Sequence, residues 1–256
     1  MKNNLFKKII KTLYPFAVLV IIWEIIFQCE VFPQYWFPGP FHVINIFFKM
    51  LFDGSLIKYS AISLLNTTLG FAAGAIFGIA LGLYAGINKT FKDFVSPLIS
   101  LVYPIPGIAW LPLVLLWFGF GYKAIIFTVG LSGFFSVFYN TLIGVENINI
   151  KYIRAGQSLG LRKFKLIKEV YFWGAFPFIF TGLKLGYGRS WRTVIAGEML
   201  SFNIHGLGWF IWRSNEFFNF DQLLVGVISI GIIGLLVDKL VFKKIEEKKL
   251  KLWSEN

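Results

Sequence analysis

The sequence predicts an all-α, polytopic membrane protein with six transmembrane helices. Two observations lead to this fold class. Apolar residues make up 57% of the 256 residues and charged residues only 15%, with 30 Phe and 9 Trp, which lies outside the range of ordinary soluble domains. The apolar residues also gather in runs of about 20, the length that a helix needs to cross a bilayer. Six such runs leave little chain for a soluble domain.

The six apolar runs form a single predicted transmembrane domain at 13–242. The third run is the least regular, because Pro97, Pro104, Pro106 and Pro112 interrupt its ladder of backbone hydrogen bonds. We therefore expect irregular backbone in that run. The predicted spans are about 13–32, 64–87, 94–118, 125–145, 174–200 and 223–242.

The distribution of basic residues predicts how these spans are oriented. Of the 25 Lys and Arg, seventeen lie in four segments that the span assignment places on one side of the membrane: 1–12, 89–92, 151–168 and 243–251. The opposite loops hold only four: Lys49, Lys58, Lys123 and Arg213. Since Lys and Arg collect in cytoplasmic loops, we expect a protein of the cell membrane with both tails, 1–12 and 243–256, in the cytoplasm. Basic residues split over short loops do not predict nucleic-acid binding.

The second run carries a ridge of glycines. Residues four apart lie on one face of a helix, and small residues there let a neighbouring backbone approach closely. A phosphate-binding glycine loop, the functional alternative, requires a strand-to-helix turn and a Lys-Ser/Thr ending that this run lacks. We therefore expect a helix-packing ridge made of Gly70, Gly74, Gly78, Gly82 and Gly86.

The fifth run carries charges that the bilayer interior penalises. Its charged residues are Lys184, Arg189, Arg192 and Glu198, and together they would cost on the order of 10 kcal/mol if all faced lipid. The two arginines lie on neighbouring parts of one helix face, where they can meet a substrate anion or pair with the carboxylate of Glu24 or Glu198. Arg189, Arg192 and Glu198 are therefore candidate substrate-pathway residues, with structural ion pairing as the open alternative.

A basic amphipathic segment at 152–170 separates the fourth and fifth runs. Its apolar residues are mostly three or four apart, with Arg and Lys between them, a pattern typical of a helix with one apolar face. Gly160 near the middle predicts a break into two short helices. An amphipathic helix on the charged side of a membrane protein offers a docking site to a soluble partner.

The segment 152–170 resembles the cytoplasmic coupling motif of ABC-importer permeases, which reads Glu-Ala-Ala, three residues, Gly, nine residues, then Ile-x-Leu-Pro. The matching positions here are Arg154, Ala155, Gly156, Gly160, Val170, Phe172 and Trp173. Arg replaces Glu at the first position and Trp replaces Pro at the last. The stretches 103–121, 180–200 and 206–212 resemble the nitrate, sulfonate and taurine branch of those permeases, so the likeness covers nearly the whole chain.

This resemblance implies the fold of a type I ABC importer permease, with a cytoplasmic coupling helix between spans four and five. It also implies three partners: cytoplasmic ATPase subunits that use ATP and Mg²⁺, a second copy of this chain, and an extracytoplasmic binding protein. The chain itself would bind no cofactor, and the substrate would be a small anion, such as nitrate, a sulfonate or taurine, or a vitamin precursor. The residues implied in ATPase coupling are Arg154, Ala155, Gly156, Leu159, Gly160, Phe164 and Val170.

A second transport class is also compatible with the sequence. An ion-coupled secondary transporter could use the carboxylates of Glu24, Glu198 and Asp238, although the two halves show no repeat of the kind that such transporters usually carry. The sequence contains no phosphate-binding loop and no nucleophile–base pair, and His42 and His205 lack neighbours at metal-ligand spacing. We therefore expect neither enzymatic activity nor a metal site in this chain.

Overall fold

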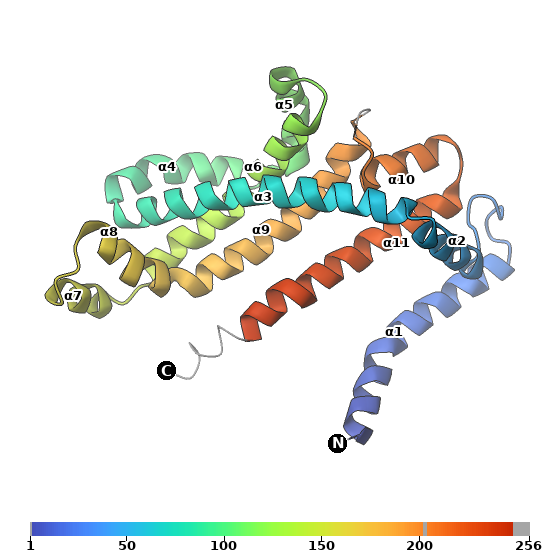
Figure 1. Ribbon diagram of the computed structural model, residues 1–256, viewed down its shortest axis with the longest axis horizontal. Coiled ribbons are helices and arrows are strands. Elements are labelled where there is room, and N and C mark those ends of the chain that lie inside the picture. Colours follow the sequence, from blue (N-terminus) through green and yellow to red (C-terminus); the bar gives the residue numbers. More distant parts are fainter. Residues whose placement is uncertain (1, 202–203, 248–256) are drawn as a thin grey trace.

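The computed structural model describes residues 2–201 and 204–247, with side chains from residue 14 onward. The described residues form helices without any strand, which confirms the predicted all-α class. Residues 248–256, most of the predicted C-terminal tail, lie outside the described residues. Three long helices run side by side through the centre (Figure 1): α3 (Ser55–Ile87), α6 (Tyr122–Glu146) and α9 (Trp173–Met199).

Close backbone contact joins α6 to both of its neighbours. The five glycines of the ridge on α3 all face α6: a Cβ atom at Gly82 would lie 2.7 Å from the Cβ of Thr141, and one at Gly74 would overlap the carbonyl oxygen of Gly130. On the α9 side, Ser190 Oγ donates a hydrogen bond of 3.0 Å to the carbonyl oxygen of Val129. The three helices therefore form a tightly packed frame.

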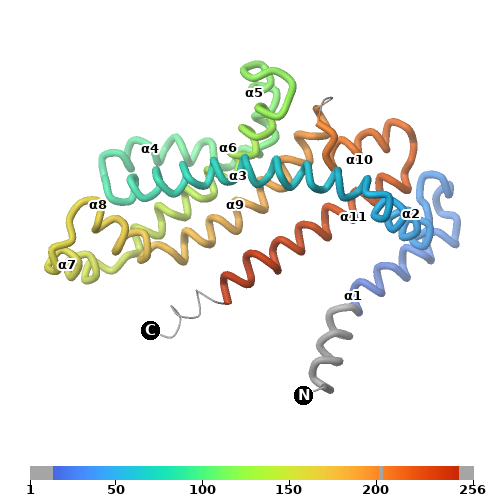
Figure 2. The backbone as a smooth tube through the Cα atoms, viewed as in Figure 1, coloured from blue at the N-terminus to red at the C-terminus, as the bar shows by residue number. Residues whose placement is uncertain are grey.

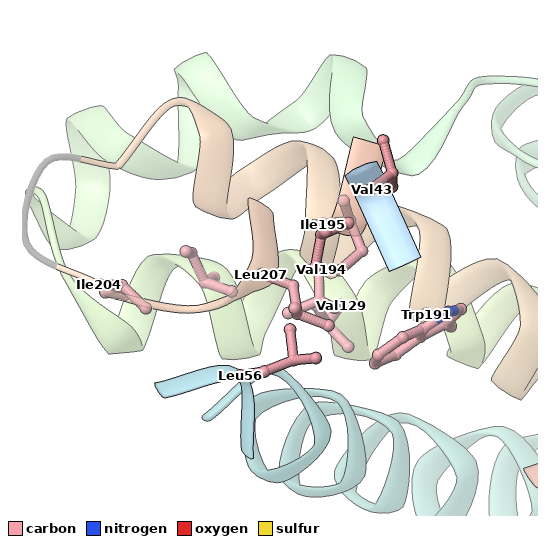
Figure 3. Packing of buried hydrophobic residues seen from close by; sticks show 10 residues of the cluster. Val43, Leu56, Val129, Trp191, Val194, Ile195, Ile204 and Leu207 are labelled. Carbon is pink, nitrogen blue, oxygen red and sulfur yellow. The ribbon is translucent and has the colours of Figure 1, made fainter. Parts of the chain in front are cut away.

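Shorter helices close one end of this frame. They surround an apolar core in which Leu56 of α3, Val129 of α6, Val194 of α9 and Leu207 of α10 converge (Figure 3). The terminal helices diverge from the frame toward the opposite end, as the tube in Figure 2 shows. The short helices are α2 (Pro40–Phe52) and α10 (Leu207–Glu216). The terminal helices are α1 (Lys2–Gln28) and α11 (Phe220–Val237), and α11 continues into the π-helical η3 (Asp238–Lys243).

The predicted third span, 94–118, is two helices rather than one. The elements are α4 (Lys89–Val102), the 3₁₀ turn η1 (Gly107–Trp110) and α5 (Leu111–Phe118), and the helical parts before and after the break differ in direction by 95°. Pro104 and Pro106 cause the break, because neither has an N–H to donate and each disfavours helical backbone in the residue before it. The irregular backbone falls in the expected run, but the bend is much larger than a kink.

Length and composition alone identify fewer membrane spans than predicted. Among the described residues, α3, α6 and the helix Phe220–Lys243 are long and apolar enough to cross a bilayer, and the bent pair of α4 and α5 would make a fourth. The described apolar part of α1, Tyr14–Gln28, is shorter. Helix α9 has sufficient length but carries four charged residues. Whether α9 can cross the membrane therefore depends on where its four charged side chains lie.

The glycine ridge yields a stability prediction. Replacing Gly74 by Ala should lower the free energy of unfolding by about 1–3 kcal/mol, because the backbone of α6 must shift to admit a Cβ atom. The matched control is Gly231→Ala on α11, where no atom lies within 4 Å of the added Cβ and Ala favours the helix by about 1 kcal/mol. Thermal unfolding in detergent measures both. A Tm for Gly74→Ala at or above that of the control would contradict the close packing of α3 on α6.

Candidate functional site

A cavity of about 630 Å³ opens where α4 breaks away from α5. Its walls come from the segment Tyr103–Trp110 and from the facing sides of α6 and α9. The lining is largely apolar, and its polar side chains are those of Tyr103, Ser132, Arg189, Arg192 and Thr193. A concave, mostly apolar site with a few convergent polar groups is the usual form of a small-molecule site.

The two arginines of α9 both reach this cavity. Arg189 is half-buried, and its Nη2 donates a hydrogen bond of 2.9 Å to Tyr103 Oη. The same guanidinium lies 4.4 Å from the centre of the Tyr103 ring, a cation–π distance. Arg192 lies three residues further along α9 and is exposed. Because no acidic residue is part of the described lining, the cavity carries an uncompensated positive charge that favours anions.

A pair of hydroxyl groups positions the backbone of the break. Thr193 Oγ1 of α9 donates to Ser132 Oγ of α6 at 3.0 Å. Gly107 rests directly on this pair, since a Cβ there would lie 2.7 Å from Ser132 Oγ and 2.8 Å from Thr193 Oγ1. Neither these three residues nor Tyr103 was predicted from the sequence as part of a site. The Tyr-Pro-x-Pro-Gly pattern that starts at Tyr103 was the available signal, because it forces a turn between two apolar helices.

Glu198, the third candidate pathway residue, lies elsewhere. Its carboxylate is fully buried and accepts hydrogen bonds from Ser63 Oγ at 2.6 Å, Gly208 N at 3.1 Å and Asn66 Nδ2 at 3.2 Å. It is not among the residues that line the cavity. The other carboxylate considered for ion pairing, Glu24, accepts from Gln28 Nε2 at 2.7 Å. Both carboxylates therefore have partners other than the two arginines.

Ion pairs account for other isolated charges of the sequence. Lys184, near the opposite end of α9, pairs with Glu246 at 3.3 Å and with Asp238 at 3.6 Å. His42 Nε2 lies 3.4 Å from a carboxylate oxygen of Asp221, a neighbour that the sequence spacing did not reveal. Among the described residues, no cluster of three or more His, Cys, Asp or Glu side chains could hold a metal ion.

The segment 152–170 forms two short helices and a π-helical turn that leads into α9. The chain turns at Gly160, whose φ of +82° is accessible to glycine at little cost. A Cβ at Gly156 would lie 2.9 Å from Val170 Cγ2, so these two motif residues hold the segment together. The elements are α7 (Ile150–Ser158), α8 (Lys163–Leu166) and η2 (Ile167–Phe172).

The other motif residues of this segment point outward. Leu159 is 82% exposed and Phe164 75% exposed, and Arg154 and Ala155 are exposed beside them. The segment contains five Lys and Arg but only one acidic residue, Glu169. An exposed face that combines large apolar and cationic side chains is typical of a docking surface rather than of a free solvated helix.

Comparison with known proteins decides the family. Residues 74–242 match the family described as binding-protein-dependent transport system inner membrane component. The chain belongs to this family. The matched range contains the whole cavity lining, the segment 152–170 and Glu198. The protein is thus a multi-pass membrane component of a transport system that works with a binding protein.

Several permeases are similar to this chain over most of their length. The taurine transport system permease protein of Escherichia coli K12 is 32% identical over 87% of this chain and 82% of its own length. A nitrate import permease protein of Synechocystis is 31% identical over 91% and 87%, and a bicarbonate transport system permease protein of Synechococcus elongatus is 33% identical over 74% and 68%. These relatives confirm the resemblance to ABC-importer permeases of the nitrate, sulfonate and taurine branch.

Proposed function

We propose that this chain is the permease subunit of an ATP-driven importer for a small anion, and that the cavity between the α4–α5 break, α6 and α9 lies on the translocation path. The observation that carries this proposal is the pair Arg189 and Arg192 in a cavity whose described lining has no acidic residue. Taurine, nitrate and bicarbonate, for which the relatives are named, each contain a negatively charged group. Their chemistry favours an anion over a vitamin precursor.

The proposed topology has six spans with both termini in the cytoplasm. The spans are α1, α3, the bent pair of α4 and α5, α6, α9, and α11 with η3. Two features support this arrangement. The turn between α3 and α4 and the segment 152–170 lie at one end of the frame (Figure 1), and both carry part of the basic excess that marks cytoplasmic loops. The short helices α2 and α10 lie at the other end.

The exposed face of the segment 152–170 is the proposed docking site for cytoplasmic ATPase subunits, which bind ATP and Mg²⁺. Helix η2 continues directly into α9, and α9 carries both arginines of the cavity. A movement imposed on the segment by ATP binding would therefore displace the cavity wall, as alternating access requires. A second copy of the chain would complete the path. Membership of a binding-protein-dependent family favours this mechanism over ion-coupled transport by Glu24, Glu198 and Asp238.

The role of Arg192 can be tested by its replacement with Gln. Loss of one charge-assisted contact to the anion, of about 1.5–3 kcal/mol, should reduce ATP-driven uptake in proteoliposomes by about ten- to a hundredfold. Assembly should be unaffected, because the exposed Arg192 leaves no buried carboxylate without a partner when it is removed. The measurement is initial uptake of labelled nitrate, bicarbonate or taurine, with the yield and Tm of the complex measured alongside.

The control for Arg192 is Lys239→Gln, which removes the same charge from an exposed position of η3 outside the cavity. Its uptake should match that of the unmodified protein. Equal uptake by the two variants would contradict the pathway role of Arg192. A loss of assembled complex in Arg192→Gln alone would instead show that the arginine stabilises the fold.

The docking proposal yields a second prediction, at Gly160. Asn and Asp tolerate a positive φ better than other non-glycine residues, so both Gly160→Asn and Gly160→Asp should fold, and they differ mainly in charge. A carboxylate in the middle of a cationic docking face should weaken attachment of an ATPase whose surface complements that charge. We expect Gly160→Asp to retain several-fold less ATPase than Gly160→Asn when the ATPase is co-purified with the tagged permease. Equal retention of the ATPase would refute this assignment of the docking face.

A further inference from the structure

Glu198 is the most buried charged side chain among the described residues, and it does not line the cavity. Its side chain comes from the last turn of α9, and its carboxylate is 0% exposed. The donors that satisfy it come from two other helices: Ser63 and Asn66 belong to α3, and Gly208 belongs to α10. A buried carboxylate that bonds to two other helices fixes their relative positions, because leaving it without partners is costly.

The carboxylate also supplies the N-terminal cap of α10. The residue at the cap position, Gly206, has no side chain to accept a bond from the first backbone N–H groups. Those groups bond to other helices instead: Leu207 N donates to Ser63 Oγ at 2.9 Å, and Gly208 N donates to Glu198 Oε2 at 3.1 Å. A negative charge at a helix N-terminus is further stabilised by the helix dipole. Helix α10 is therefore anchored at its first turn to α9 and α3.

The glycines around this cap leave room for nothing larger. A Cβ at Gly206 would overlap the carboxylate of Glu198, and one at Gly208 would overlap the carbonyl oxygen of Ile195 and lie 2.8 Å from Glu198 Cβ. Leu207, between them, packs into the apolar core beside Val194 (Figure 3). The Gly-Leu-Gly sequence is thus explained by contact with the end of α9, and the surrounding core keeps water away from the carboxylate.

We propose that Glu198 is the joint that makes α10 move as one body with α9, and that it transmits docking of the external binding protein to the cavity and the ATPase side. This inference rests on the proposed function, in which α10 lies on the external face and 152–170 on the cytoplasmic face. Helix α9 is continuous over 27 residues, roughly 40 Å. One end follows η2, Arg189 and Arg192 lie along it, and Glu198 anchors the other end to α10.

Helix α10 also presents the surface on which docking would act. Trp212 and Arg213 are exposed on it, and Trp212 Nε1 donates to Glu216 Oε1 at 3.0 Å. The guanidinium of Arg213 lies 5.1 Å from the ring centre of Trp209 and 5.0 Å from that of Phe217. Aromatic residues and arginine are enriched where proteins bind one another. Force applied to this face reaches α9 through the Glu198 cap.

The experiment uses the complete transporter, with its ATPase subunits and binding protein, in lipid nanodiscs. The variant Glu198→Gln keeps the volume of the side chain but removes its negative charge and replaces one of its two acceptor oxygens by an NH₂ group. The bonds from Ser63 and Gly208, which share one oxygen, lose their charge assistance, and the amide NH₂ at the other place cannot accept from Asn66. Ser63→Ala removes the hydroxyl that links Leu207 to the carboxylate and leaves only a small void. The control, Ser229→Ala, removes a buried hydroxyl whose bond to Val225 stays within α11.

ATPase activity is measured per assembled complex against the concentration of substrate-loaded binding protein. In Glu198→Gln the maximal stimulation over the basal rate should fall by about tenfold, within the range typical of coupling between sites. The basal rate and the half-saturating concentration of binding protein should stay near those of the unmodified complex. Ser63→Ala should show a smaller fall in stimulation, and Ser229→Ala none.

Other outcomes would overturn the inference. If Glu198→Gln and Ser63→Ala keep full stimulation, the cap does not transmit docking. If basal and stimulated rates fall by the same factor, or if only the half-saturating concentration rises, Glu198 stabilises the fold or shapes the docking surface and does not couple the two helices. If the unmodified complex hydrolyses ATP without any response to the binding protein, the proposed function fails, and this inference fails with it.

Discussion

The structure depends on the placement of the four charged side chains of α9, a helix that otherwise lies in apolar surroundings. Each ionic side chain of α9 that faced lipid would cost a few kcal/mol, so the fold must provide a place for every one. Lys184 pairs with two carboxylates near the end that leads to 152–170, and Glu198 is enclosed by three donors at the other end. Arg189 and Arg192 lie between them and open into the cavity. The charged side chains at the two ends of α9 are bonded to other parts of the protein, and only the two arginines in its middle can meet a solute.

The frame of α3, α6 and α9 is what makes these placements possible. Glycines let α3 and α6 touch along their backbones, and hydroxyl bonds such as Ser190 to Val129 join α6 to α9. The polypeptide between α4 and α5 cannot continue as a helix, so it lies across this frame at Gly107, against the hydroxyls of Ser132 and Thr193. The cavity is thus a consequence of a proline break held against a rigid surface.

Local signals in the sequence were sufficient to predict the class of the fold and to single out the two arginines that line the cavity. The apolar runs predict membrane-spanning helices. A charged residue within such a run is costly in lipid, so the sequence alone marks it as a residue that needs a partner or a polar cavity. The prolines of the third run predicted where its backbone becomes irregular but not the 95° bend found there, because periodicity does not reveal how far a proline break bends the chain. Glu198 could not be separated from the arginines on sequence alone, since its donors Ser63 and Asn66 come from a helix more than 130 residues earlier. Tertiary packing alone brings those side chains together.

The N-terminal cap of α10 is a second feature that depends on tertiary packing and could not be predicted from local sequence. The Gly-Leu-Gly sequence was recognisable as part of a family resemblance, but its physical reason is the end of α9 pressing on both glycines. The acceptor that satisfies the start of α10 belongs to another helix, so no search for a local capping residue could find it. Similarly, the exposure of Leu159 and Phe164 distinguishes the outward face of 152–170 from Gly156 and Val170, which hold it together.

The central claim is that the cavity beside Arg189 and Arg192 conducts an anion. It is tested most directly by the reactivity of a cysteine placed at Ala196, which lines the cavity one turn beyond Arg192, in a protein whose natural Cys29 is replaced by Ala. We expect an anionic thiosulfonate reagent to modify this cysteine at least about tenfold faster than a cationic reagent of similar size, and the transported anion to slow that modification. Equal rates for the two reagents, with no protection by any small anion, would contradict the account.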